Sequence, residues 1–383
     1  MRVIHVITRL IVGGAQENTI ASVLGLRQKP GTEVELISGP TFGPEGSLED
    51  RVARIPGLLT VVPEIVRPVH PLKDLVATRK LEDIFRARKP DIVHTHSSKA
   101  GIVGRVAAAR AGVPVIVHHI HGPSFGPFQG AMANVTFRAA ERYAGKVTTH
   151  FIVVAEAMKS QYIAAGIGKP DMYTRIFSGF PVLPYVNAVN DPALRVRLGF
   201  NSDDFIIGKI ARFVPRKGHA DLLRALQMLL PQCPRARLLL LGDGILHSLM
   251  RKTVNDMGLA DKVVFAGLVS PGEVPQYVGI MDCLAHLSTF PEGLPRALPQ
   301  ALAAGKPVVS YDFDSAEEVC LEGETGFLIC SGDAATAAKR LLQLAGDAAL
   351  RQRLGERGQQ FVREKFSVER MVDEQHALYL RLC

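Results

Sequence analysis

Residues 291–309 read PEGLPRALPQALAAGKPVV and place an acidic residue on a loop, a helix directly after it and a strand at the end. Pro299 has no backbone N–H and fits only the first turn of a helix, so the helix is expected to begin near Arg296. A helix start presents unpaired N–H groups, and Glu292 beside it can accept hydrogen bonds from hydroxyl groups. The segment therefore predicts a pocket for a ligand with phosphate and hydroxyl groups, with Gln300 near its open end. An ordinary loop and amphipathic helix is the alternative.

The loop–helix–strand pattern of this segment continues along the chain in both directions. Short runs rich in Val and Ile are apolar throughout rather than at every second position, which predicts strands buried on both faces and hence parallel sheets covered by helices. The predicted strands form two sets, Val3–Ile7, Val34–Ser38, Asp91–Thr95, Val115–His119 and Phe151–Ala155, then Ile206–Ala211, Leu238–Leu241, Val263–Ala266, Cys283–Leu287 and Val308–Ser310.

Two domains are expected, because 383 residues exceed what one hydrophobic core usually holds. The stretch 181–192, rich in Pro and Asn, predicts a linker between an N-terminal domain, residues 1–180, and a C-terminal domain, residues 193–366. Residues 367–383 are expected to form a helix that crosses back to the N-terminal domain. The expected fold class is α/β, with two Rossmann-like parallel sheets facing across a cleft and ligands at the carboxyl ends of the strands.

Composition excludes several classes of protein. A hydrophobic content of 47% with 21% charged residues is typical of a soluble globular protein, and no uncharged apolar run is long enough to span a bilayer. The first residues, MRVIHVITRLIVGG, are too strand-like for a signal peptide. Five cysteines without a C-x-x-C pair disfavour a disulfide scaffold and a zinc site. A cytoplasmic location is therefore expected.

The net charge of +8 lies entirely in the first half, since residues 1–185 hold 22 Lys and Arg against 14 Asp and Glu. This excess favours an anionic partner, either a phosphorylated acceptor or the inner face of a membrane, to which the basic segment 79–89 would bind peripherally. A solvated basic face without a partner is the alternative. Nucleic acid is not expected, because the chain has no Trp and no recognisable nucleic-acid-binding motif.

Two strand-to-helix corners carry residues suited to phosphate. Gly13 and Gly14 follow the first predicted strand and open a helix, where glycine allows a phosphate to approach the backbone. The segment is not a G-x-G-x-x-G, so a tight turn without a ligand is the alternative. Arg212 and Lys217 flank a second corner, where cations would stabilise the charge that develops on a departing diphosphate. Solvated charges at a helix start are the alternative there.

Five histidines, His94, His96, His118, His119 and His121, lie between residues 91 and 122. A metal site is one interpretation, but strand alternation points His118 away from His119 and no nearby carboxylate pairs with them. His121 ends a strand and faces the expected cleft, whereas the other histidines are expected to be structural or to lie on the acceptor side.

The segment 291–309 resembles the signature of glycosyltransferase family 4, EGxPxxxxEAxAxGxPVV. The family's second Glu is replaced by Gln300. The matching residues are Glu292, Gly293, Pro295, Ala301, Ala303, Gly305, Pro307, Val308 and Val309. Residues 211–218 resemble the family's GRxxxxKG, residues 240–244 its LxGxG turn, and residues 264–268 its base-binding loop, although a plain strand-to-helix connection is the alternative for the last two.

The resemblance implies roles for individual residues. Arg212 and Lys217 would bind phosphate, Glu292 would orient sugar hydroxyl groups, and His121 would lie against the donor sugar. The implied donor contacts are Gly14, Gly242, Gly267, Leu268, Gly293, Leu294, Pro295 and Gln300. The candidate acceptor contacts are Ser97, Ser98, Lys99 and Arg105.

The function implied is that of a retaining hexosyltransferase of the GT-B fold that needs neither a metal nor a cofactor. Its donor would be a UDP- or GDP-linked sugar and its acceptor a glycan or lipid-linked glycan, in the synthesis of lipopolysaccharide or another surface polysaccharide. Two alternatives stay open: a GT-B sugar-nucleotide epimerase, and a non-catalytic sugar-nucleotide or glycan-binding protein, which Gln300 motivates.

Overall fold

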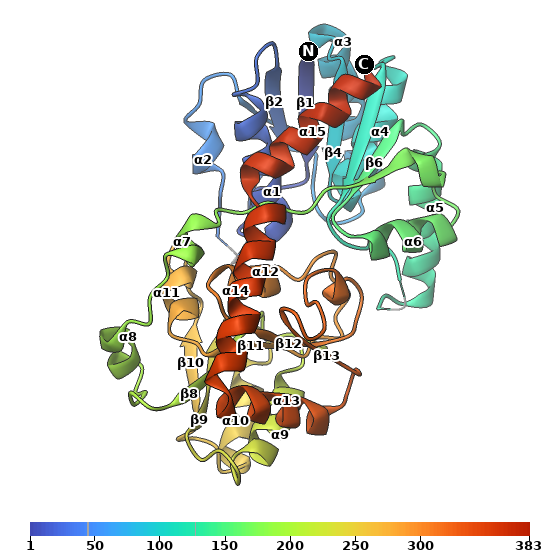
Figure 1. Ribbon diagram of the computed structural model, residues 1–383. Coiled ribbons are helices and arrows are strands. Elements are labelled where there is room, and N and C mark those ends of the chain that lie inside the picture. Colours follow the sequence, from blue (N-terminus) through green and yellow to red (C-terminus); the bar gives the residue numbers. More distant parts are fainter. Residues whose placement is uncertain (44–45, 127) are drawn as a thin grey trace. The chain divides into compact units, whose positions relative to one another are not determined.

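The computed structural model describes residues 1–43, 46–126 and 128–383. Its internal contacts divide the chain into two units, Met1–Phe180 together with Phe366–Cys383, and Pro181–Lys365. Each unit is a parallel sheet with helices packed against it (Figure 1). Each predicted strand is present, with ends within two residues of those expected.

The first unit is built on a seven-stranded sheet of order β3-β2-β1-β4-β5-β6-β7. Its strands are β1 (Arg2–Ile7), β2 (Glu33–Ser38), β3 (Leu59–Val61), β4 (Ile92–His96), β5 (Val115–Ile120), β6 (His150–Val153) and β7 (Tyr173–Arg175). Its helices are α1 (Gly14–Leu26), α2 (Asp50–Ala53), α3 (Pro71–Arg88), α4 (Ser98–Arg110), α5 (Ala131–Gly145), α6 (Glu156–Ala164), a 3-10 turn at Pro170–Met172, and α15 (Val368–Leu382).

The apolar strands of this unit bury both of their faces, as the sequence predicts. Val3 packs in the core beneath α1 and α15, whereas the next residue, Ile4, packs in the core beneath α3 and α4. The C-terminal helix α15 thus completes the first unit, and its approach to α1 is close enough that a Cβ on Gly25 would lie 2.4 Å from Val372. Figure 1 shows α15 lying along α1.

The second unit is built on a six-stranded sheet of order β10-β9-β8-β11-β12-β13. Its strands are β8 (Phe205–Ile210), β9 (Ala236–Leu241), β10 (Val263–Gly267), β11 (Cys283–His286), β12 (Val308–Tyr311) and β13 (Gly326–Ile329). Its helices are α7 (Leu183–Val186), α8 (Pro192–Arg197), α9 (His219–Leu229), α10 (His247–Asp256), α11 (Val274–Gly279), α12 (Ala297–Ala303), a 3-10 turn at Ala316–Glu318, α13 (Ala334–Gly346) and α14 (Ala348–Lys365).

Both sheets have a point at which the strand order reverses. In the first unit β1 lies between β2 and β4, and in the second β8 lies between β9 and β11. Loops that leave neighbouring strands in opposite directions open a crevice at the carboxyl edge, which is where ligands of open α/β sheets bind. The β1/β4 and β8/β11 edges are therefore the places to look for functional side chains.

Some details differ from the sequence-based expectations. The stretch 181–192 contains helix α7, which packs against α11 and α12, so it is part of the second unit rather than a free linker. Helix α12, in contrast, begins at Ala297 directly after Arg296, as expected, which places Pro299 in the first turn where its missing N–H costs nothing. None of the helices in the described ranges combines the length and hydrophobicity needed to cross a membrane.

Candidate functional site

A cluster of charged side chains lies at the β8/β11 edge of the second unit. Lys217 Nζ is 2.8 Å from Glu292 Oε1, and His286 Nε2 is 3.3 Å from the same oxygen. The Ser288 hydroxyl donates a 3.2 Å hydrogen bond to this oxygen. The Lys217 side chain is 8% exposed and that of Glu292 is 23% exposed, so the carboxylate is the more open member of the pair.

The backbone brings Lys217 to this position through a glycine. Gly218 adopts φ 71°, and a Cβ at this residue would lie 1.5 Å from the carbonyl oxygen of Leu287, so no other residue fits. The N–H of Thr289 donates a 2.8 Å hydrogen bond to the carbonyl of Arg216, which ties the β11 loop to the β8 loop. The Lys217 amine is thereby fixed next to the loop that carries Glu292.

The loop after β12 supports the acidic residue from the other side. The N–H of Glu292 donates a 3.0 Å hydrogen bond to Asp314 Oδ2, and the Ser315 hydroxyl donates a 2.7 Å bond to the carbonyl of Gly293. The loops after β8, β11 and β12 therefore meet at Glu292, so its position is set by three strand ends rather than by its own loop.

The charges in this cluster are strongly coupled. Burial alone would raise the pKa of Glu292, but His286 and Lys217 outweigh it and hold that pKa well below its usual range. Lys209, in β8, is fully buried and its amine has no hydrogen-bond partner among the described residues. Burial, helped by the nearby charge of Lys217, lowers the pKa of Lys209 to about 7. Glu292 and Asp221 both act to raise the pKa of Lys209, but they offset only part of the lowering.

Arg212, which follows β8, lies next to the glycine loops expected to bind the donor. Gly242 has φ 132° and a Cβ there would lie 2.1 Å from the carbonyl of Ala211, so the loop after β9 passes directly over the backbone before Arg212. The N–H of Gly242 donates a 2.8 Å hydrogen bond to the carbonyl of Gly267. Arg212 and Leu268 are exposed, and this edge thus groups three of the predicted donor contacts with Arg212.

The remaining predicted donor contacts of this unit are on or before α12. Leu294 and Pro295 are buried, whereas Gln300 is partly exposed within the helix. Leu294 and Pro295 therefore contribute to the loop through packing and backbone, whereas part of the Gln300 residue is accessible to solvent.

In the first unit, two hydroxyl groups lie within hydrogen-bond distance of each other at the β1/β4 edge. Thr8 Oγ1 and Ser97 Oγ are 2.7 Å apart, and the N–H of Ala100 donates a 3.2 Å hydrogen bond to Thr8 Oγ1. Ser97, with φ 61°, is the residue before α4, and Gly13, with an extended φ of 176°, is the residue before α1. Gly14 is the first residue of α1, so it lies at the same edge as this hydroxyl pair.

The four predicted acceptor residues differ in exposure, because three of them are partly exposed and Arg105 is fully buried. The Ser98 hydroxyl donates a 2.8 Å hydrogen bond to Ser124, and Lys99 forms an ion pair with Asp74. Ser97, Ser98 and Lys99 are all partly exposed.

The prediction that Arg105 contacts an acceptor does not fit the structure. Its side chain is fully buried and lies 2.6 Å from Glu141, which is also fully buried. It also donates hydrogen bonds to the carbonyl of Gly101 and to Thr148. A buried arginine is costly unless it is paired, and Glu141 is the partner here. Arg105 therefore links α4 to α5 and is not available to a ligand.

Histidines from three strands form a buried cluster on one face of the first sheet. Its members are His5 of β1, His94 and His96 of β4, His119 of β5, and His121, which follows β5. His118 lies on the opposite face, where its Nδ1 is 2.9 Å from Thr95 Oγ1, as strand alternation predicts. Two triads in the cluster, His5–His94–His96 and His96–His119–His121, have ligand nitrogens within 4.8 Å of one another, a spacing that could hold a metal ion.

Burial keeps these rings neutral at physiological pH. It lowers the pKa of His5 and that of His121 to about 3, and it lowers the pKa of His94, His96 and His119 well below the usual value. A neutral imidazole carries one N–H donor and one bare nitrogen acceptor, so the cluster acts through hydrogen bonds rather than through charge.

Several residues of the two clusters escaped the sequence analysis. His5, Lys209 and His286 are polar residues inside otherwise apolar strands, and this interruption is a signal that the sequence does contain. Asp314 and Ser288 carry no such signal, because short polar residues on loops are common.

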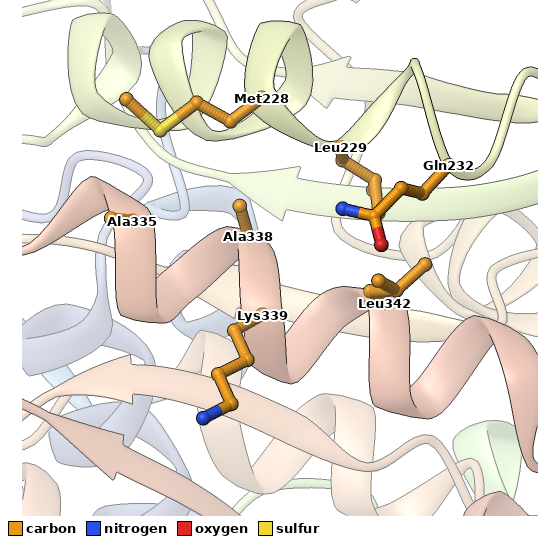
Figure 2. Close-up of a pocket in the computed structure, with 7 residues that line it drawn as sticks. All are labelled: Met228, Leu229, Gln232, Ala335, Ala338, Lys339 and Leu342. Atoms are coloured by element: carbon orange, nitrogen blue, oxygen red, sulfur yellow. The ribbon is translucent and has the colours of Figure 1, made fainter.

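The hollow shown in Figure 2 lies elsewhere in the second unit, between α9 and α13, and has a volume of about 380 Å³. It is lined by Met228, Leu229, Gln232, Ala335, Ala338, Lys339 and Leu342. None of these residues is among the predicted site residues. The lining is mainly aliphatic and offers one amine and one amide, so it does not resemble the charged β8/β11 edge.

Comparison with known proteins gives a family match for each half of the chain. A model described as "Glycosyl transferases group 1" matches residues 190–361, and one described as "Glycosyl transferase 4-like domain" matches residues 13–175.

Relatives that match about three quarters or more of the chain are named as glycosyltransferases. The UDP-Gal:alpha-D-GlcNAc-diphosphoundecaprenol alpha-1,3-galactosyltransferase of Escherichia coli is 27% identical over 76% of this chain and 75% of its own length. The capsular polysaccharide biosynthesis glycosyltransferase CapM of Staphylococcus aureus is 24% identical over 82% of each chain. Among solved structures, Anabaena Alr3699/HepE in complex with UDP superposes with a TM-score of 0.83, covering 100% of both chains at 24% identity.

Proposed function

The chain belongs to the family 4 glycosyltransferases of the GT-B fold, and on this premise we propose that it transfers a hexose from a nucleoside diphosphate sugar to a glycan or lipid-linked acceptor. The acceptor would serve the synthesis of a surface polysaccharide or glycolipid. The names of the relatives support this class of substrate, since one is named for a diphosphoundecaprenol-linked acceptor and another for capsular polysaccharide.

The observation that carries the proposal is the Lys217–Glu292 pair at the β8/β11 edge. When a nucleoside diphosphate leaves, it gains negative charge, so a cation aimed at it lowers the transition state more than the ground state. Lys217 is a buried cation of this edge that pairs with Glu292, and Arg212 is an exposed cation on the same loop. Glu292 holds Lys217 in place and keeps its second oxygen for the hydroxyl groups of the donor sugar.

We propose retention of the anomeric configuration by displacement on the front face of the sugar, without a metal ion. In this reaction the bond from the anomeric carbon to the diphosphate oxygen breaks, the acceptor oxygen bonds to that carbon, and the acceptor proton passes to the departing diphosphate. Lys217, Arg212 and the backbone around Gly293 supply the positive charge, while His121 binds a hydroxyl group of the donor sugar.

A panel of UDP- and GDP-linked sugars in a thermal-shift assay tests the identity of the donor. A ligand that binds only the folded protein raises the melting temperature in proportion to the logarithm of its concentration, once that exceeds its dissociation constant. We expect a nucleoside diphosphate with the correct base to stabilise the protein and free hexoses to leave it unchanged. Absence of any shift with every member of the panel would remove the proposed donor class.

Gln300→Glu is expected to tighten donor binding about five- to tenfold. By resemblance, this residue faces the hydroxyl groups of the nucleotide ribose, and an amide offers neutral hydrogen bonds of about 0.5–1.5 kcal/mol where a carboxylate offers about 1.5–3. Titration of the parent and the variant with the same nucleoside diphosphate measures the difference. Gln343→Glu, an exposed change on α13, is the control, and equal affinities for parent and Gln300→Glu would show that Gln300 does not face the ligand.

Gln300 also motivates a second candidate, a protein that binds sugar nucleotides without turnover. A parent protein that binds donor but transfers nothing to any acceptor preparation, while Gln300→Glu restores transfer, would establish this alternative. An epimerase would instead convert the donor in the absence of any acceptor.

Peripheral binding to an anionic membrane is expected to be weak and salt-dependent. The basic segment 79–89 lies on and just beyond α3, but Lys80, Arg86 and Arg88 pair with acidic residues of their own unit, which reduces the charge that remains for lipid. Each basic residue near an anionic surface contributes about 1 kcal/mol, and salt screens the attraction.

Sedimentation with vesicles of neutral or anionic lipid, at low and high salt, measures this binding. We expect sedimentation only with anionic vesicles at low salt. Equal binding to neutral and anionic vesicles, or none to either, would contradict the membrane proposal.

A further inference from the structure

Three histidines of the buried cluster form a hydrogen-bonded chain that ends at His121. His5 Nδ1 is 2.9 Å from His96 Nε2, and His96 Nδ1 is 2.9 Å from His121 Nε2. The three rings come from β1, β4 and the residue after β5, so the chain runs across neighbouring strands of the sheet. His96 is the middle member and is fully buried.

A chain of neutral imidazoles allows only two arrangements of its protons, because each ring has one N–H and one bare nitrogen. In the first, His5 donates from Nδ1 to His96, His96 donates from Nδ1 to His121, and the remaining proton of His121 is on Nδ1. In the second, both hydrogen bonds are reversed and each ring carries its proton on Nε2. The state of His96 therefore fixes the state of His121.

Each arrangement leaves one buried N–H without a partner among the described residues, at His5 Nε2 in the second and at His121 Nδ1 in the first. An acceptor from outside the protein can approach only the His121 end, because His5 is fully buried and His121 is not. Orphaned buried N–H groups are rare in proteins, so an acceptor at the His121 end would favour the first arrangement.

That N–H is placed to serve a ligand. His121 Nδ1 is buried and has no partner in the described part of the chain, but the residue as a whole is partly exposed, unlike His5 and His96. His119 stacks against His121 with ring centroids 4.0 Å apart and an interplanar angle of 20°, which limits rotation of the ring. A ligand oxygen that accepts from Nδ1 would complete the chain.

We propose that His96 and His5 are positioning residues that hold His121 in the Nδ1–H tautomer, so that it donates a hydrogen bond to an oxygen of the donor sugar. The coupling between the tautomers of the three rings follows from the described contacts alone, whereas the preference for Nδ1–H at His121 depends on an acceptor for that atom, and the identity of this acceptor rests on the proposed function. His94 offers a matched comparison. Its ring centroid is 4.3 Å from that of His96, but its Nδ1 bonds the hydroxyl of Tyr379 and it is not a member of the chain.

Long-range ¹⁵N–¹H correlation spectra of protein labelled with ¹⁵N-histidine distinguish the two tautomers of each ring, and spectra of single variants assign them. We expect the Nδ1–H pattern for His121 in the parent protein. His96→Phe should shift His121 toward the Nε2–H pattern, whereas His96→Asn, whose amide can take the place of Nδ1 as a donor, should preserve Nδ1–H. His94→Gln should leave His121 unchanged.

The variants should rank in the same order by their effect on kcat as by their effect on the tautomer of His121. His96→Phe should lower kcat about three- to tenfold, the usual worth of one neutral hydrogen bond, with a smaller effect for His96→Asn and none for His94→Gln. An unchanged melting temperature for His96→Phe shows that the loss is not one of folding. If the melting temperature of His96→Phe is lowered, the proposal is tested instead with the His121 spectrum and the transfer rate of His96→Asn and of His5→Asn.

Three results would overturn the proposal: an Nε2–H pattern for His121 in the parent, an unchanged tautomer in His96→Phe, or stoichiometric transition metal on the cluster in the purified protein. A parent that shows the expected tautomers but transfers no sugar would leave the positioning role intact and remove the proposed function instead.

Discussion

Glu292→Gln is expected to lower kcat/KM about ten- to a hundredfold. The substitution keeps the size of the side chain but removes the charge that holds Lys217 at 2.8 Å and that would accept hydrogen bonds from the donor sugar. A hydrogen bond to a charged group is worth about 1.5–3 kcal/mol, and each 1.4 kcal/mol is a factor of ten. The loss should appear mainly in kcat, because the charge of Lys217 matters most when the diphosphate departs.

Initial rates of sugar transfer at several donor concentrations measure this effect. Glu356→Gln, the same change on the exposed face of α14, serves as the control and should retain the parental rate. The melting temperature of Glu292→Gln should fall somewhat, since Lys217 loses its buried partner beside Lys209. A folded Glu292→Gln protein with parental kcat/KM would show that the reacting site lies elsewhere.

Mild acid is expected to unfold the first unit. Burial lowers the pKa of seven of its histidines: His5, His94, His96, His118, His119, His121 and His150. Between the lowered values and the unfolded value of about 6.5, the unfolded chain binds more protons, so stability falls as the pH falls below about 6.5. In this range each such histidine lowers the free energy of unfolding by about 1.4 kcal/mol per pH unit. The total free energy of unfolding of a typical protein is about 5–15 kcal/mol.

Circular dichroism and intrinsic fluorescence from pH 7.5 to 3.5 should therefore show unfolding complete well above the pKa of ordinary carboxyl groups. His119→Phe keeps the stack on His121 but removes one titrating ring, and it should move the midpoint to lower pH. His70→Asn, at an exposed helix start, should leave it unchanged. A parent protein that stays folded at pH 4 would contradict the buried, neutral state of these rings.

The two sheets could be predicted from sequence because their central strands are apolar on both faces. β1, β4 and β5, like β8, β9 and β11, lie between neighbours and under helices, so their composition carries the signal. The strands that the sequence analysis missed, β3, β7 and β13, are short and lie at the edges of their sheets. An edge strand is stabilised by its one neighbour more than by its own composition, so three or four residues carry little pattern.

Part of the candidate site could likewise be predicted from the sequence, and part of it could not. Arg212, Lys217 and Glu292 could be found because each follows a recognisable strand and the loops resemble a family signature. The pairing of Lys217 with Glu292 could not, because it depends on Gly218 passing over the backbone of Leu287, a contact between segments about seventy residues apart in the chain.

Arg105 is a residue that the sequence analysis wrongly assigned to the site. A cation on a helix that begins at the β4 edge is a reasonable candidate for an acceptor contact, and only the structure shows that its side chain turns inward to Glu141. The acidic partner lies on α5, so no local pattern around Arg105 reveals the pair. The histidine chain is a similar case, since its three rings come from three strands and the register between them decides the hydrogen bonds.

The most direct test of the central claim is transfer of a radiolabelled hexose from UDP- or GDP-sugars to a lipid or glycan extract, with the parent, Glu292→Gln and Glu356→Gln proteins side by side. The account predicts labelled product with the parent and with Glu356→Gln, and at least tenfold less with Glu292→Gln. No labelled product from any donor with the folded parent, or equal product from Glu292→Gln, would contradict it.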